Sequence, residues 1–412
     1  MAQQHLDPTD PTAGAVAGDA LAGYLRAQAT EFLRALRLHR ETGGGTSNGS
    51  GESVDAARAL RRSARRISAS LHTFRPLLDT DWSEAIRPEL AWLSGTLAME
   101  HAYSARLERL LLALHRLSGA TPLPTQTGTA GASGASRLTD TAASGRTDTA
   151  TGSRTHAAAA GRAEATAASR ANAAAGSRAA GAASLPPKAA PPAGPPAHPT
   201  PTAERGNLTV GAAKAGALLE RQLTLARTRA HSTALQALGS SRFHAVADNI
   251  AVLASEVPLT PAAATGDLRP LAAAAEERLS DAVTALPLVT AGHPYNAEAL
   301  IHGLSPDPAP HPQDAPWHQV RLLLRLHRYA REVLHGDDDL VDVRLLTAGQ
   351  ALNRHRDASE AAAAAAQAAR TPRIAPATAY ALGVLHADQR HEVEAARFAF
   401  QQSWQIQPAG RT

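Results

Sequence analysis

The chain has 412 residues and a formal net charge of +4, and of its 41 basic side chains only Lys188 and Lys214 are lysine. It contains no cysteine, which excludes disulfides, thiolate catalysis and cysteine-bound zinc. No apolar run approaches the roughly 18 residues of a membrane span, and the first residues lack the pattern of a signal peptide. We therefore expect a cytoplasmic protein without membrane contact.

The composition predicts an all-α fold, because Ala, Leu, Arg and Glu dominate the periodic segments while β-branched runs are scarce. Residues 1–14 are polar and contain prolines, so they are expected to form a disordered tail. Residues 15–119 are predicted to form a first helical half, which the run "ETGGGTSNGSGES" interrupts. Its last part forms one or two helices, with Pro88 at a bend or boundary.

Residues 120–206 are predicted to be a long disordered insertion. They are rich in Ala, Gly, Ser and Thr, have few large apolar side chains with which to bury a core, and end in a proline-rich segment that favours polyproline II. Helical periodicity returns near Leu208, so residues 207–408 are predicted to form a second helical half. Within that half, residues 290–316 are a proline-rich connection, and the final helix ends near Trp404.

Five arginines crowd one short segment of the first half. At about 100° per residue, they and one histidine fall within an arc of roughly 140° on one helix. These residues, here called the first strip, are Arg58, Arg61, Arg62, Arg65, Arg66 and His72. Leu60, Ala64, Ile67, Leu71 and Phe74 face the opposite side. No acidic residue lies between Arg58 and Arg75 to offset the charge, so the first strip is predicted to bind an anion.

A second helix, predicted over residues 317–334, has the same pattern. Within about 100° of arc it places a second strip, His318, Arg321, Arg325, Arg328 and Tyr329, together with Glu332. The first three of these repeat the i, i+3, i+7 spacing of Arg58, Arg61 and Arg65. The repetition suggests two related halves whose strips face one cleft. His327 points to the apolar side and is expected to be a core histidine.

Two segments resemble the signatures of the CHAD family, the conserved histidine α-helical domain. They are "RALRRSARRISASLHTFRPLLD" and "HQVRLLLRLHRYAREVL", and the flanking "PELAWLSGTL" and "LNRHRDASEAA" are similar as well. The resemblance implies two helical bundles with a pseudo-two-fold relation around a basic groove, here in a stand-alone member. It also implies binding of inorganic polyphosphate.

The resemblance assigns site residues position by position. The matched positions of the first signature are Arg61, Arg65, Arg66 and Arg75, and those of the second are His318, Arg321, Arg328 and Tyr329, with Arg325 where lysine is common. The sequence departs from the family pattern at Arg58, which replaces a histidine, and at His101 and Ala102, which replace an Arg-Asp pair.

The sequence therefore predicts a polyphosphate-binding protein with both strips and Arg75 as its site, and it suggests the hypothesis that the protein is recruited to polyphosphate granules. Guanidinium groups suit such a ligand because they stay charged and donate paired hydrogen bonds to phosphate oxygens. Catalytic motifs and metal-ligand spacings are not apparent, so we expect no enzymatic activity, cofactor or metal site.

Two alternatives stay open. The first is non-specific binding to a nucleic-acid backbone, which is disfavoured because the strips lack interleaved aromatic residues for base stacking. The second is a helical scaffold that has lost ligand binding, as the departures at Arg58, His101 and Ala102 suggest. The sequence indicates no oligomeric state.

Overall fold

The computed structural model describes residues 11–43, 50–119, 201–292, 311–336 and 342–405, all within one compact unit. In these residues there is no β-strand, and only one isolated antiparallel bridge joins Leu78 to Leu259. The all-α prediction is confirmed. None of the helices in the described ranges is long and apolar enough to cross a membrane. Most of the predicted insertion, residues 120–200, lies outside the described residues, as do residues 1–10 of the predicted tail.

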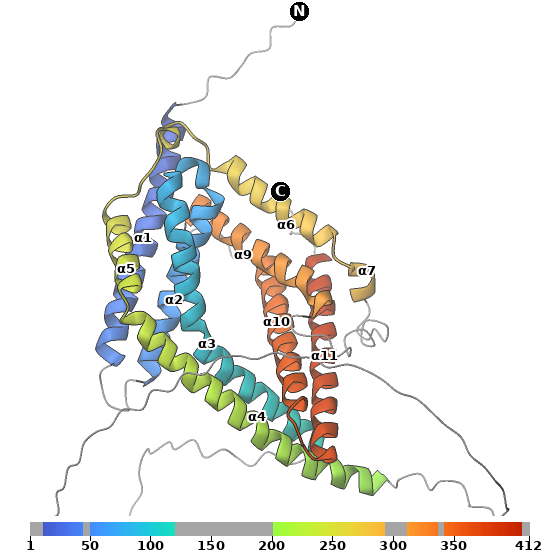
Figure 1. The fold of residues 1–412 in the computed structure, drawn as a ribbon. Coiled ribbons are helices and arrows are strands. Elements are labelled where there is room, and N and C mark those ends of the chain that lie inside the picture. The colour runs from blue at the N-terminus through green and yellow to red at the C-terminus, as the bar shows by residue number, and fades with distance from the viewer. Residues whose placement is uncertain (1–10, 44–49, 120–200, 293–310, 337–341, 406–412) are drawn as a thin grey trace, which may run out of the picture. The chain divides into compact units, whose positions relative to one another are not determined.

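The helices before the insertion resemble the predicted pattern, except that the first begins at Pro11, inside the predicted disordered tail of residues 1–14 (Figure 1). They are α1 (Pro11–Gly43), α2 (Ser50–Thr73), the 3-10 turn η1 (Arg75–Leu77) and α3 (Thr80–Ser118). The Asp79 side chain caps α3 by accepting a hydrogen bond from the Trp82 backbone N–H at 2.8 Å. Of the two alternatives for this segment, the structure has one helix, which continues through Pro88.

The first helix after the insertion, α4, starts at Pro201, earlier than the predicted residue 207. This start is compatible with the sequence because proline is well tolerated in the first turn of a helix. The helices after the insertion are α4 (Pro201–Leu238), α5 (Ser241–Ser255), η2 (Pro261–Ala264), α6 (Arg269–Thr284), α7 (Leu288–Ala291), η3 (Pro312–Asp314), α9 (Ala315–His335), α10 (Val343–Ala369) and α11 (Pro376–Gln405). Ser240 separates α4 from α5 by capping the Phe243 backbone N–H.

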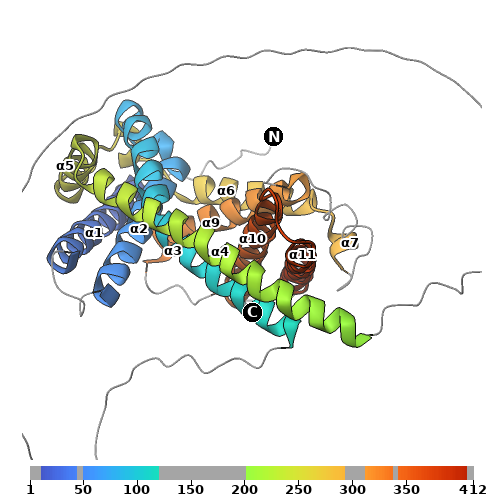
Figure 2. The same ribbon diagram turned by 60° about the horizontal axis from the view of Figure 1, so that its bottom comes forward.

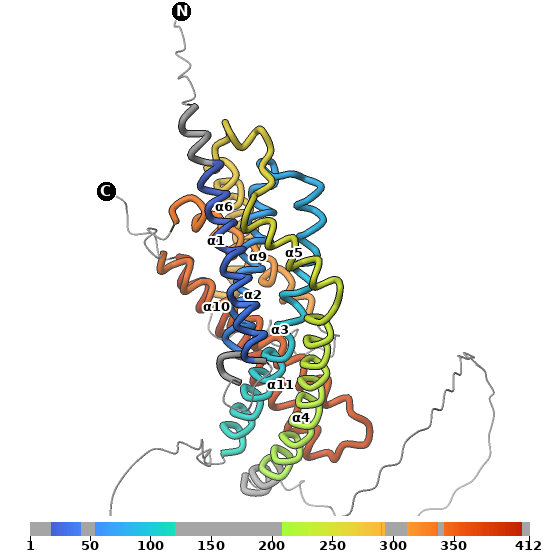
Figure 3. Tube along the Cα trace, turned by 90° about the vertical axis from the view of Figure 1, so that its left-hand side faces the viewer, coloured from blue at the N-terminus to red at the C-terminus, as the bar shows by residue number. Residues whose placement is uncertain are grey.

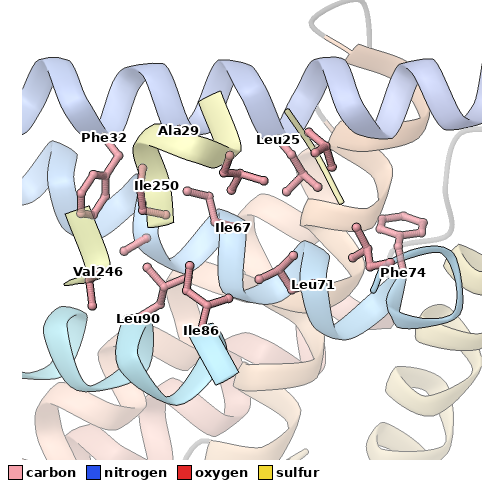
Figure 4. Close-up of a cluster of buried hydrophobic side chains, with 14 of the residues drawn as sticks. Leu25, Ala29, Phe32, Ile67, Leu71, Phe74, Ile86, Leu90, Val246 and Ile250 are labelled. Carbon is pink, nitrogen blue, oxygen red and sulfur yellow. The ribbon is translucent and has the colours of Figure 1, made fainter. Parts of the chain in front are cut away.

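The first hydrophobic core lies between α1, α2, α3 and α5 (Figure 4). Its fully buried side chains include Phe32, Ile67, Leu90 and Ile250. The predicted apolar face is confirmed, since its four side chains on α2 and Phe74, directly after the helix, are each at most 1% exposed. Because α2 buries this face, the first strip points away from the core.

Two further cores complete the unit. One joins the C-terminal part of α3 to α4, α10 and α11, and the other joins α6, α9, α10 and α11 around Trp317. Helices from the two sides of the insertion therefore pack together: α4 runs along α3 (Figure 2), and α5 lies beside α1 (Figure 3). The helix α9 contacts α1, α2, α6 and α10, and this position brings the second strip to the first.

The contact between α4 and α11 predicts opposite effects of two glycine substitutions. A Cβ atom at Gly211 would lie 2.1 Å from the carbonyl oxygen of Ala377 on α11, whereas a Cβ atom at Gly95 on α3 would meet nothing within 4 Å. We expect Gly211→Ala to lower the thermal unfolding midpoint. Gly95→Ala should raise the free energy of unfolding by up to about 1 kcal/mol, the usual helix-propensity gain. Stabilisation by both substitutions would contradict the close packing of α4 on α11.

Candidate functional site

The two strips meet where α2 and α9 contact each other. Six arginines from these two helices line one cavity of about 250 Å³, together with Leu324, Tyr329, Glu332, Gly349 and Asn353. The six arginines are Arg62, Arg65 and Arg66 on α2, and Arg321, Arg325 and Arg328 on α9. We call this space the arginine cavity. Seven of the twelve predicted site residues, these six arginines and Tyr329, therefore line the same cavity.

Positive charge is crowded and partly buried around the arginine cavity. Burial, followed by the charges of Arg65 and Arg356, lowers the pKa of Arg61 to about 10. Burial and the charges of Arg325 and Arg356 lower the pKa of Arg321 to about 9. Burial likewise lowers the pKa of Arg325, with Arg65 contributing. These groups stay protonated at neutral pH, so their repulsion persists in the folded protein.

Few carboxylates offset this charge. In the part of the chain that the structure describes, no ion pair forms at Arg61, Arg62, Arg65, Arg325 or Arg328. Arg321 donates from Nε to the neutral Asn353 Oδ1 at 2.9 Å. The Nε atoms of Arg61 and Arg65 are buried without a hydrogen-bond partner in the protein. Buried donors of this kind carry an unrecovered desolvation cost, which an anionic ligand would offset.

Arg66 differs from its neighbours because it has a carboxylate partner. Its Nε donates to Glu332 Oε2 at 2.7 Å and its Nη2 to Oε1 at 3.3 Å. The Tyr24 hydroxyl donates to the same Oε2 at 3.0 Å, and the guanidinium carbon of Arg66 lies 5.6 Å from the centroid of the Tyr329 ring. Burial would lower the pKa of Arg66, but the hydrogen bond and charge of Glu332 raise it. This group ties α1, α2 and α9 together.

Three of the predicted site residues have other surroundings. Arg58 pairs with Asp55 one turn earlier on α2, and Arg75 pairs with Glu84 on α3 at 3.0 Å. His72 Nδ1 lies 3.1 Å from Arg87 Nη2, and burial, followed by Arg87, lowers the pKa of His72. None of the three lines the arginine cavity. The residues of the first strip do lie on one helix, as predicted. The C-terminal end of the strip, at His72, faces α3 and α6 rather than α9.

His318 lies near the start of α9, above a buried ionic network. Its ring centroid is 5.4 Å from that of His355 in an edge-on arrangement, and burial lowers the pKa of His318, with Asp314 opposing and Arg321 assisting the shift. The fully buried Asp314 accepts hydrogen bonds from Arg390 at 2.7 Å and from Arg397 at 2.6 Å. The network therefore fixes the N-terminal end of α9 on α10 and α11.

Two side chains of the site were missed in the sequence. Arg356 on α10 repels Arg61, Arg321 and Arg325, although it also pairs with Asp357. Asn353, one turn earlier on α10, accepts the bond from Arg321. Two signals could have identified them: their spacing in "LNRHRDASEAA", which places both on one helix face, and the family resemblance of that segment. His327 is 5% exposed, so its prediction as a core histidine is confirmed.

No group of three or more His, Asp or Glu side chains suited to a metal ion occurs in the described ranges. Asp337, Asp338 and Asp339, which follow one another in the sequence, lie outside those ranges. The family positions at which this chain departs, His101 and Ala102, lie on α3, and neither lines the arginine cavity.

Comparison with known proteins identifies the family. A sequence model described as the CHAD domain matches residues 27–202 and 197–366, so two successive parts of the chain match the same family. The structure of PptA from Streptomyces chartreusis is similar, with a TM-score of 0.65 and 63% sequence identity over 94% of this chain and 99% of that chain. No match was found among functionally curated proteins. The family matches span most of the chain and both strips, and the chain therefore belongs to the CHAD domain family.

Proposed function

We propose that this chain binds inorganic polyphosphate through the arginine cavity and the cations beside it, without turning the polymer over. The observation on which the proposal rests is that six arginines from two helices face a single cavity, whose described lining contains one carboxylate. Membership of the CHAD domain family supports the same ligand. Recruitment of the protein to polyphosphate granules would be the cellular consequence.

The arginine cavity suits a ligand that is recognised by its high density of negative charge alone. Polyphosphate has a negative charge on every unit but no base edge or hydrophobic group, so a receptor recognises it by charge density. Guanidinium groups donate paired hydrogen bonds to phosphate oxygens, and even the lowered pKa of Arg321, about 9, leaves it charged at neutral pH. Each charge-assisted bond contributes roughly 1.5–3 kcal/mol, so several together support micromolar or tighter binding, about −8 kcal/mol or better.

The lining argues against the alternatives. Tyr329 is its only aromatic side chain in the described chain, and the guanidinium of Arg66 already lies over that ring, so nucleic-acid bases gain no stacking platform. The one carboxylate in the lining, Glu332, is occupied by Arg66 and Tyr24. This pairing leaves the cavity without a free general base and supports binding without hydrolysis.

The proposal predicts salt-sensitive binding that depends on four arginines, three in the lining of the arginine cavity and Arg61 outside that lining. We expect the wild type to bind long-chain polyphosphate at sub-micromolar concentration at low salt, and less tightly at physiological salt because counterion release drives association. Replacement of Arg61, Arg65, Arg321 and Arg325 by alanine should weaken binding by at least roughly 100-fold, since several contacts of roughly 1.5–3 kcal/mol are lost. Fluorescence or calorimetric titration measures both effects.

A charge-matched control separates the site from general electrostatics. Arg34 and Arg37 on α1 and Arg227 and Arg229 on α4 are exposed, and their replacement by alanine removes the same net charge. This control should retain nearly wild-type affinity, and circular dichroism should show both variants to be helical. Equal binding by the two variants, or no binding by the wild type, would refute the proposed site and favour a scaffold without ligand. Displacement of polyphosphate by equally charged duplex DNA would favour the nucleic-acid alternative.

The unpaired arginines also predict a conflict between stability and affinity. Arg61→Met removes a partly buried cation that has no carboxylate partner in the described chain, so the thermal unfolding midpoint should stay level or rise by roughly 1–3 °C while polyphosphate affinity falls. Arg66→Met should instead lower the midpoint, because it leaves the half-buried Glu332 without its cation. Scanning calorimetry of the apo proteins measures both, and equal destabilisation would show that Arg61 has an unidentified counter-anion.

A further inference from the structure

Among the described residues, Glu332 is the only carboxylate in the lining of the arginine cavity. It also lines a second, larger cavity of about 770 Å³ between α1, α9 and α10. The two cavities share three residues, Arg66, Arg328 and Glu332. The Arg66–Glu332 pair therefore stands at the boundary between the two spaces.

The contacts of Glu332 are those that a phosphate group would make in its place. Both carboxylate oxygens accept hydrogen bonds from the guanidinium of Arg66, and Oε2 accepts a further bond from the Tyr24 hydroxyl. Paired donation of this kind is shared by arginine–carboxylate and arginine–phosphate interactions. Of the six arginines that line the arginine cavity, Arg66 is the one with a carboxylate partner among the described residues.

Glu332 affects an incoming polyanion in two ways. It accepts hydrogen bonds from Nε and Nη2 of Arg66, so a phosphate must break that pair before it gains the same bonds. Its own negative charge also repels a phosphate at the edge of the arginine cavity. Both side chains of the pair are only about a quarter exposed, 27% for Arg66 and 28% for Glu332, so solvent screens this interaction less than it screens a surface pair.

We propose that Glu332 is an internal competitor for the polyphosphate site: it limits the affinity and ends the ligand track at Arg66, short of the larger cavity. This inference rests on the proposed function. It also accounts for the presence of a carboxylate within an arginine cluster, because the same three hydrogen bonds tie α1, α2 and α9 together when no ligand is bound.

The test is the isosteric variant Glu332→Gln, titrated with long-chain polyphosphate at low salt. Removal of the charge frees Arg66 while the amide oxygen still accepts from Tyr24, so we expect binding roughly tenfold tighter than wild type, as for one added charge-assisted contact. The dependence of affinity on salt should become steeper, since one more arginine engages phosphate. The added substitution Arg66→Met should abolish this gain.

Two control variants separate this effect from loosening of the fold and from net charge. Tyr24→Phe removes a donor to Glu332 without changing any charge, so it should loosen the same contact yet give no gain in affinity. Asp388→Asn neutralises a carboxylate that pairs with Arg116 at 2.7 Å and lies outside the arginine cavity. It should leave the affinity close to wild type.

The outcomes distinguish this inference from the proposed function. If the wild type binds and only Glu332→Gln binds more tightly, Glu332 is a competitor. If the wild type binds and Glu332→Gln binds equally or more weakly, the inference is wrong, and Glu332 instead positions Arg66 for the ligand. An equal gain from Asp388→Asn also overturns it, because net charge alone would then explain the effect. If the wild type does not bind, the proposed function has failed first.

Discussion

Repulsion between guanidinium groups is the constraint around which this structure is built. Burial lowers the pKa values of Arg61, Arg321 and Arg325, and the charges of neighbouring arginines on α2, α9 and α10 lower them further. Apolar packing on the opposite faces of the helices overcomes this repulsion. Ile67 on α2 and Val320 on α9 are fully buried, and the hydrophobic free energy gained there holds the charged faces together.

Each end of α9 has its own electrostatic anchor. At the N-terminal end, the buried Asp314 accepts hydrogen bonds from Arg390 and Arg397 of α11. Although burial alone would raise it, the hydrogen bonds and charge of Arg390 hold the pKa of Asp314 well below its usual range. At the C-terminal end, Glu332 joins Arg66 and Tyr24. Between the two anchors lie Arg321 and Arg325, which keep their charge without a carboxylate partner in the described chain. A site of this kind is preorganised, so less free energy is spent on ordering it when a ligand binds.

The sequence allowed prediction of the helices, the buried face of α2 and the family, because helical periodicity and local signatures are properties of short segments. Which members of the first strip face α9 could not be predicted from such local patterns. His72 shares the helical arc of Arg61 and Arg65, yet it faces Arg87 of α3, since the crossing of three helices decides which part of an arc meets which neighbour. The Arg66–Glu332 pair joins residues 266 positions apart. Arg356 stood in an alanine-rich helix whose sequence has almost no amphipathic pattern.

A crystal structure of the chain with bound polyphosphate tests the central claim most directly. The account predicts phosphate density between α2 and α9, in contact with Arg65, Arg321 and Arg325. Density only along the exposed arginines of other helices, or beside His72 and Arg75 with an empty arginine cavity, would contradict it.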